Sequence, residues 1–233
     1  MSRSAKLRRA TTTEMRRATT AEARRATAKL AIAPARVSRK LDLGCGFVPK
    51  EGFEGVDIRG DKMTHKVDLF RFPWPFEDAS VDELHSSHLV EHIPAREIEE
   101  RDLAENATDA DRERFVGQDM LFAFFDESYR ILVPDGWMTV IVPSGRSSRA
   151  FMDPTHRRFL MQETFLYLAA EWRKINSLQH YRVNCNFACD VGHSMPQEEG
   201  ARSQDAQAMR VMHYWNTTVD WIAKLKKLPP PGA

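Results

Sequence analysis

The most informative part of the sequence is LDLGCG at residues 41–46. An apolar run that ends in Gly-x-Gly predicts a short buried strand followed by a tight turn. Glycine lacks the Cβ that would keep the backbone away from a ligand, so such a turn can approach one closely. A dinucleotide fingerprint needs a further glycine three residues later, and Pro49 stands there. The pattern therefore favours a ligand-binding turn and weakens the case for a pyrophosphate ligand.

Three acidic residues are expected around this turn. Asp42 belongs to the strand before it, Asp57 closes the strand predicted in FEGVDIR, and Asp68 closes the one predicted in KVDLF. In an open α/β sheet the carboxyl ends of the strands meet in one crevice, where Asp57 could hold ribose hydroxyls and Asp68 an exocyclic amine. Each acid alone could equally be a turn or capping residue. As a set, they suit a cationic ligand better than a diphosphate.

Strand and helix patterns alternate along the rest of the chain, which predicts an α/β fold with a mainly parallel sheet. VDELHSSHLVEHIP at 81–94 predicts a strand that runs into the start of a helix. RFVGQDMLFAFFDESYRIL at 114–132 predicts a helix that Pro134-Asp135-Gly136 ends, and a strand is expected at 137–143. Alternating apolar residues at 183–190 and 219–226 predict two strands at the far edge of the sheet, and residues 191–209 a polar loop.

The first 36 residues differ in composition from everything that follows. They repeat an eight-residue unit, RRATTTEM, RRATTAEA and RRATAKLA, beginning at Arg8, Arg16 and Arg24. Residues 1–40 carry twelve Lys and Arg against two Glu, a net charge of +10, which leaves −9 on the rest of the chain. We predict a basic arm, disordered or loosely helical, at 1–36, because so few large apolar residues cannot repay the entropy of ordering. A solvated tail, an electrostatic tether to nucleic acid or another polyanion, and an organelle transit peptide remain open as its role.

The overall composition is that of a globular protein, with 42% hydrophobic and 29% charged residues in 233. No apolar run approaches the ~18 residues that cross a bilayer, so we expect no membrane span. Three cysteines are too few for a disulfide scaffold. They suggest a reducing compartment, and we expect the protein in the cytoplasm.

These motifs together resemble those of the class I S-adenosylmethionine-dependent methyltransferases over residues 40–145, and more loosely a small bacterial and phage subgroup beyond. The resemblance implies a Rossmann-like, doubly wound, mainly parallel sheet of about seven strands with helices on both faces. It places a methyltransferase domain at 37–228, with the cofactor half at about 40–145 and the acceptor side and C-terminal strands at about 146–228. The segments that carry it are LDLGCG (41–46), VDLFRFPWPFEDASVDELHSSHLVEHIP (67–94) and YRILVPDGWMTVIVPS (129–144).

The resemblance also implies the cofactor, S-adenosyl-L-methionine, with S-adenosyl-L-homocysteine as its product. Asp57 would be the ribose ligand, while Ser87 and His88 would flank the sulfonium. Cys45 is interpreted as a backbone contact, not a nucleophile. The full set of implied cofactor contacts is Asp42, Gly44, Cys45, Gly46, Asp57, Ile58, Asp68, Leu69, Ser87 and His88.

The acceptor side is predicted from histidines near the sheet edge. Methyl transfer needs positioning and a deprotonated acceptor, and histidine is the readiest base near neutral pH. We expect His156, Asp153 and His88 to be the catalytic residues, with His92 capping or packing a helix. A lid-supporting loop is the competing interpretation of 153–158. The acceptor is an unidentified O or N group, with a small or sugar-like molecule favoured by analogy of fold.

Other chemistries have weaker support. Cys185, Cys189 and His193 have suggestive spacing, but strand residues four apart lie ~13 Å from each other, so we expect no metal. The aromatic residues of 70–76 could stack on a base, yet packing of a loop or cover for the adenine is favoured. Motifs of DNA base methyltransferases are not found in the sequence. A polyanion-binding module with a non-catalytic, cofactor-binding body and a different adenosyl-group reaction, such as aminopropyl transfer, remain as alternatives.

Overall fold

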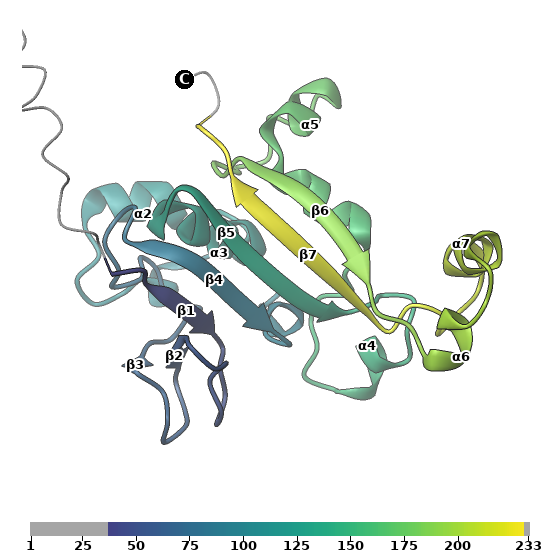
Figure 1. The fold of residues 1–233 in the computed structure, drawn as a ribbon. Helices are drawn as coiled ribbons and strands as arrows, with labels where there is room; N and C mark the ends of the chain where they lie inside the picture. The colour runs from purple at the N-terminus through teal and green to yellow at the C-terminus, as the bar shows by residue number, and fades with distance from the viewer. Residues whose placement is uncertain (1–36, 231–233) are drawn as a thin grey trace, which may run out of the picture. The chain divides into compact units, whose positions relative to one another are not determined.

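The computed structural model describes residues 37–230, and the arm predicted at 1–36 lies outside that range. Seven strands of the described chain form one sheet in the order β3-β2-β1-β4-β5-β7-β6 (Figure 1). Their bounds are β1 Lys40–Leu43, β2 Glu54–Asp57, β3 His65–Lys66, β4 Val81–Ser87, β5 Leu132–Pro143, β6 Phe187–His193 and β7 Asp220–Lys227.

The sheet is mainly parallel, as predicted. The pairs from β3 to β5 are parallel, and β7 pairs antiparallel with both β5 and β6. The chain moves outward from β1 to β3 and then returns to place β4 on the other side of β1. This reversal is the topological switch at which ligands bind in open α/β sheets, outside the carboxyl ends of the strands. The predicted Rossmann-like α/β fold is confirmed, and the sheet positions the residues after β1 and β4 side by side.

Side chains alternate between a buried and a partly exposed face of the sheet. Leu84, Met138 and Val140 are fully buried. The exposed face has polar cross-strand neighbours, such as Lys40, which forms an ion pair with Glu83 at 2.6 Å. Period-two alternation therefore reflects a sheet with one face in the core and one nearer water.

The helices follow β4 in the sequence, and Figure 1 shows α2 and α3 behind the sheet. Within the described chain, the connections from β1 to β4 contain no helix, which is the main departure from the expected cover on both faces. The α-helices are α2 Asp109–Phe115, α3 Met120–Ile131, α4 Arg149–Met152, α5 Ala170–Ile175, α6 Gln197–Gly200 and α7 Gln204–His213, and the 3-10 helices are η1 Val90–His92, η2 Glu100–Asp102 and η3 Gln162–Leu168.

The aromatic stretch at 70–76 packs mostly into the core. Phe72, Trp74 and Phe76 are buried. The Phe72 ring stacks on Phe115 of α2 with centroids 5.3 Å apart, and Trp74 meets Phe124 of α3 edge-on at 5.2 Å. Loop packing is therefore the main role of these rings, and Phe70 alone of the segment reaches the pocket described below.

Three local predictions differ from the structure. Pro134-Asp135-Gly136 does not separate a helix from a strand, because α3 ends at Ile131 and β5 runs through it to Pro143. β6 begins only at Phe187, because the N–H groups of Asn184 and Cys185 donate to the Asp126 carboxylate. The polar segment 191–209 is not a loop: α6 and most of α7 lie there, and the Ser203 hydroxyl caps α7 by accepting from Ala206 N–H.

No helix among residues 37–230 is both long and apolar enough to span a bilayer.

Candidate active site

The glycine turn follows β1 at the switch point. Gly44 and Gly46 have φ angles of 73° and 58°, the left-handed region that side chains rarely adopt. A Cβ on Gly44 would lie 2.8 Å from Leu89 Cδ2 and 2.9 Å from Leu89 Cβ, whereas a Cβ on Gly46 would meet nothing within 4 Å. A glycine is therefore needed at position 44 for two reasons, its backbone angle and its close approach to Leu89, two residues after β4.

Two carboxylates hold this turn through backbone N–H groups. Asp57 accepts from Gly46 N–H at 2.8 Å and from Arg59 N–H at 3.1 Å. Asp42 is 5% exposed, accepts from Lys50 N–H at 2.8 Å and lies 2.7 Å from His85 Nδ1. Asp42 therefore fixes the loop from within, and Asp57 holds the turn from the side of the pocket.

A pocket lies where these elements meet. Five of the residues predicted to contact the cofactor line it: Gly44, Asp57, Ile58, Asp68 and Leu69. Val67, Phe70 and Leu89 complete the lining, and sequence reasoning missed them because ordinary apolar residues give no motif. The cavity volume is about 60 Å³, well below the ~300–1,000 Å³ of typical ligand pockets. An adenosyl group would therefore have to move apolar side chains such as Leu89 and Phe70 aside.

The other predicted cofactor residues lie beside this pocket without lining it: Asp42, Cys45, Gly46, Ser87 and His88. Burial, and then the charges of Asp57 and Asp42, raise the pKa of the Cys45 thiol to about 11. A thiol with that pKa is protonated and a poor nucleophile, in keeping with the interpretation of Cys45 as a backbone contact.

A second group of side chains lies just beyond β4. His88 Nδ1 is 3.1 Å from Glu91 Oε1, and His156 Nε2 is 4.0 Å from the same oxygen. The hydrogen bond to Glu91 raises the pKa of His88, against an opposing effect of burial. The rings of His92 and His156 lie 4.7 Å apart. The structure thus brings His88 and His156 together around a buried glutamate.

Asp153 supports this group indirectly. It accepts from the Thr155 N–H at 2.7 Å and from the Thr155 hydroxyl at 2.6 Å, and the same hydroxyl lies 3.1 Å from His92 Nδ1. These hydrogen bonds from Thr155 lower the pKa of Asp153. Glu91 and Thr155 were not singled out from the sequence, because the contacts that join them to His156 and His92 span more than sixty residues of the chain.

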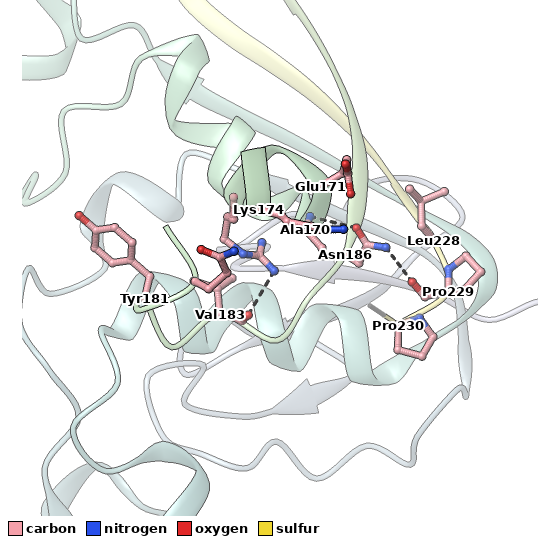
Figure 2. Close-up of a pocket in the computed structure, with 11 residues that line it drawn as sticks. Ala170, Glu171, Lys174, Tyr181, Val183, Asn186, Leu228, Pro229 and Pro230 are labelled. Atoms are coloured by element: carbon pink, nitrogen blue, oxygen red, sulfur yellow. Dashed lines mark hydrogen bonds between the residues drawn. The ribbon is translucent and has the colours of Figure 1, made fainter. Parts of the chain in front are cut away.

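A cavity of about 650 Å³ lies elsewhere, between α5 and the end of the described chain (Figure 2). Several of its polar groups are paired with one another. Asn186 donates to Pro229 O and accepts from Ala170 N–H, and Arg173 donates to Val183 O. None of the sequence-predicted site residues lines this cavity, so its larger size alone does not make it the active site.

The cysteine-rich region does not assemble a metal site among the described residues. The three side chains that do come within shared reach of one ion are Glu91, His92 and His156, not Cys185, Cys189 and His193. Cys185 is fully buried, and the Cys189 thiol donates to Phe165 O at 3.2 Å. Burial raises the pKa of Cys189 to about 12.

The sequence matches no protein-family model, and no curated protein is similar to it. Solved structures with a similar fold include S-adenosylmethionine-dependent methyltransferases from three organisms. The one from Archaeoglobus fulgidus is 18% identical over 91% of this chain and 94% of that one, with a TM-score of 0.47. The Mesorhizobium loti structure is 14% identical over 81% and 90%, with a TM-score of 0.42. The Methanosarcina mazei structure is 13% identical over 82% and 92%, with a TM-score of 0.41.

These similarities concern the fold. The seven-stranded sheet, with its switch point at β1 and β4 and its antiparallel β7, has the Rossmann-like α/β architecture that the sequence motifs predicted.

Proposed function

We propose that this protein is an S-adenosyl-L-methionine-dependent methyltransferase that acts on an O or N acceptor. The observation that carries the proposal is the convergence of Gly44, Asp57 and Asp68 on one pocket at the switch point of the sheet. Three separate strands contribute to it, so a structural role for each acid alone does not account for their meeting.

The pocket residues suit an adenosyl sulfonium in charge and in the apolar surface that they offer to an adenine. Asp57 would accept from the ribose hydroxyls, while Asp68 and the apolar Ile58, Leu69 and Phe70 would hold the adenine. Ser87 and His88 at the end of β4 would flank the sulfonium. The bound cofactor supplies an electrophilic methyl group. The protein's own contribution is to position the acceptor in line with it and to take up the acceptor's proton.

The acceptor would enter beside His156. Phe151 and Phe159 stack with ring centroids 4.5 Å apart, and Trp215 lies 5.8 Å from Phe151. All three rings are about half exposed. Flat apolar surfaces next to a candidate base suit the C–H face of a small, sugar-like acceptor. His156 and His88 would act as bases, with Asp153 as a positioning residue.

We also infer that the reaction takes place in the cytoplasm. All three cysteines are free thiols, as a reducing compartment requires.

Calorimetry of the full-length protein with S-adenosylmethionine and S-adenosylhomocysteine tests the cofactor. We expect one site for each, weakened in Asp57→Ala and unchanged in Asp61→Ala, an exposed acid of the following loop. A tritiated-methyl transfer screen against size-fractionated extracts then tests the acceptor class. An absence of binding by either nucleoside would overturn the proposal.

The alternative, a polyanion-binding module, is favoured by one observation, the net +10 of residues 1–40. It predicts nucleic-acid binding that weakens steeply with salt and disappears when residues 1–36 are removed. Salt-insensitive methyl transfer by the truncated protein would count against it.

A further inference from the structure

Three potential metal ligands converge beyond the carboxyl end of β4. One carboxylate oxygen of Glu91 and one ring nitrogen each of His92 and His156 all lie within 4.8 Å of one another. Glu91 and His92 belong to η1, and His156 comes from the loop after α4. Two histidines and a carboxylate form a recurrent ligand set for divalent transition metals.

The hydrogen bonds of His156 fix which of its nitrogens is available. Its Nδ1 lies 2.8 Å from the backbone oxygen of Ala150. A carbonyl oxygen can only accept, so Nδ1 carries the proton and donates. In the neutral ring, Nε2 is then left with a free lone pair, and this is the nitrogen that faces Glu91 Oε1 at 4.0 Å.

A chain of hydrogen bonds fixes His92 in the same way. The Thr155 hydroxyl donates its single proton to Asp153 Oδ1, so toward His92 Nδ1 it can only accept. Nδ1 of His92 is therefore the donor, and its Nε2 also carries a free lone pair. Both rings are oriented by an oxygen acceptor behind them, which is the usual outer support of metal-binding histidines.

Glu91 supplies the charge. It is 1% exposed, and its Oε2 has no hydrogen-bond partner in the described part of the chain. Its other oxygen accepts from His88 Nδ1 at 3.1 Å. A buried carboxylate oxygen without a partner is costly unless a proton or a cation satisfies it.

We propose that Glu91, His92 and His156 bind a divalent transition metal ion, of which Zn²⁺ is the best match, and that the ion coordinates the acceptor oxygen. The 4.0 Å between His156 Nε2 and Glu91 Oε1 is too long for a hydrogen bond. It is close to the ~3.4 Å that separates two ligands of a tetrahedral ion with bonds of ~2.1 Å. Three protein ligands would leave a fourth position of a tetrahedral ion for the acceptor.

The role of the ion rests on the proposed methyltransferase function and deepens it: with the ion bound, His156 serves as a ligand and His88 alone is left as the base. A metal-bound hydroxyl loses its proton more easily, and His88 could receive that proton. The oxygen lone pair then forms the new O–CH₃ bond while the methyl–sulfur bond breaks and its electrons return to sulfur. The sulfonium and the alkoxide thereby become a thioether and a methyl ether, with atoms and charge balanced.

Zinc binding by the untagged, full-length, chelator-treated protein is the direct test. Equilibrium dialysis with ZnCl₂, read by elemental analysis, should give one tightly bound Zn²⁺ per chain, and MgCl₂ should bind far more weakly because Mg²⁺ prefers oxygen ligands. The double variant His92→Ala, His156→Ala should lose that site. Thr155→Val should weaken it by ~10–100-fold, as expected for an outer partner.

His213→Ala is the matched control, because it removes an exposed histidine at the end of α7 and should bind Zn²⁺ as the wild type does. No stoichiometric zinc on the wild type, or equal zinc on the wild type and the double variant, overturns the inference. The zinc stoichiometry of the wild type tests the inference even if a variant does not fold.

The two proposals fail separately. Glu91, His92 and His156 do not line the adenosyl pocket, so S-adenosylmethionine should bind the metal-free protein. If the protein binds S-adenosylmethionine but no zinc, the methyltransferase proposal stands and the metal inference fails. Zinc binding without any cofactor binding overturns the methyltransferase proposal instead.

Discussion

The two sides of the candidate active site are built by different means. Around the glycine turn, carboxylates are held by backbone N–H groups close in sequence: Asp57 accepts from Gly46 and Arg59, and Asp68 from Phe70. Around Glu91, side chains hold side chains across more than sixty residues, as with Thr155 and His92. The first arrangement is encoded locally and the second depends on the tertiary fold. Substitutions should therefore have separable effects on the two sides.

The largest difference between an effect on methyl transfer and an effect on cofactor binding is expected at His156. His156→Ala should lower methyl transfer by ~10²–10⁴-fold, the usual contribution of a positioned acid–base group. Its affinity for S-adenosylmethionine should stay within about twofold of wild type, because His156 does not line the adenosyl pocket. Transfer assays and calorimetry on the same preparation measure both. Parallel losses of activity and affinity would show that the two sides are not independent.

Asp57→Ala should have the opposite effect, with weaker cofactor binding and unchanged metal binding. Asp57→Ala should weaken S-adenosylmethionine binding by ~100-fold, since a single charge-assisted hydrogen bond to the ribose contributes about 1.5–3 kcal/mol. It also removes the carboxylate that holds the Gly46 and Arg59 N–H groups of the turn. Its metal binding should equal that of the wild type. Asp61→Ala, in the same region but exposed, controls for the loss of a negative charge. Unchanged cofactor affinity in Asp57→Ala would remove Asp57 from the site.

Two glycines test how tightly the turn is tied to the residue after β4. Gly46→Ala should cost only the backbone strain of a positive φ, ~1–2 kcal/mol. In a protein of this size that corresponds to a melting temperature lower by ~2–8 °C. Gly44→Ala should melt lower still, because its Cβ would also displace Leu89, and should bind cofactor less tightly. Equal melting temperatures would mean that Leu89 adapts freely.

The same contrast explains what could be predicted from the sequence. Gly44, Asp57 and Asp68 lie at the ends of strands that short apolar runs mark in the sequence. The apolar runs and the glycines of the turn therefore predict where these three residues lie. The structure brings these three to one pocket, although their contact with cofactor stays a prediction. Glu91, Thr155 and the hydrogen-bond roles of the histidine nitrogens have no local signal. α7 was not predicted because its sequence is polar. The strand predicted at 183–190 begins late because the Cys185 N–H donates to the buried Asp126 carboxylate instead of to a neighbouring strand.

A smaller effect concerns the turn that ties the two sides together. Asp102 receives two hydrogen bonds from Arg96, which lower its pKa below the ordinary value of 3.8, against an opposing effect of burial. Its backbone oxygen accepts from Phe72 N–H, next to the segment that follows the pocket. A depressed carboxyl pKa gives stability that is complete above the unfolded value and is lost as pH falls through the folded one.

Urea unfolding measured from pH 7 down to pH 3 should therefore show a declining midpoint at the acid end. In Asp102→Asn the midpoint should be lower at pH 7 and decline less steeply. The same pH slope in both proteins would contradict this account of Arg96 and Asp102.

The smallest effect is expected at Cys45, where the turn meets its two acids. With a pKa of about 11 against an ordinary 9.0, the folded protein holds about a hundredfold less Cys45 thiolate at a given pH. Iodoacetamide labelling at pH 8, followed by peptide mass spectrometry, should therefore modify Cys45 far more slowly in the folded protein than in urea. Asp57→Ala should speed the folded reaction, because one of the two negative charges that raise this pKa is gone. If labelling in Asp57→Ala is as slow as in wild type, burial alone protects the thiol, and the carboxylate acts on the turn only through its hydrogen bonds.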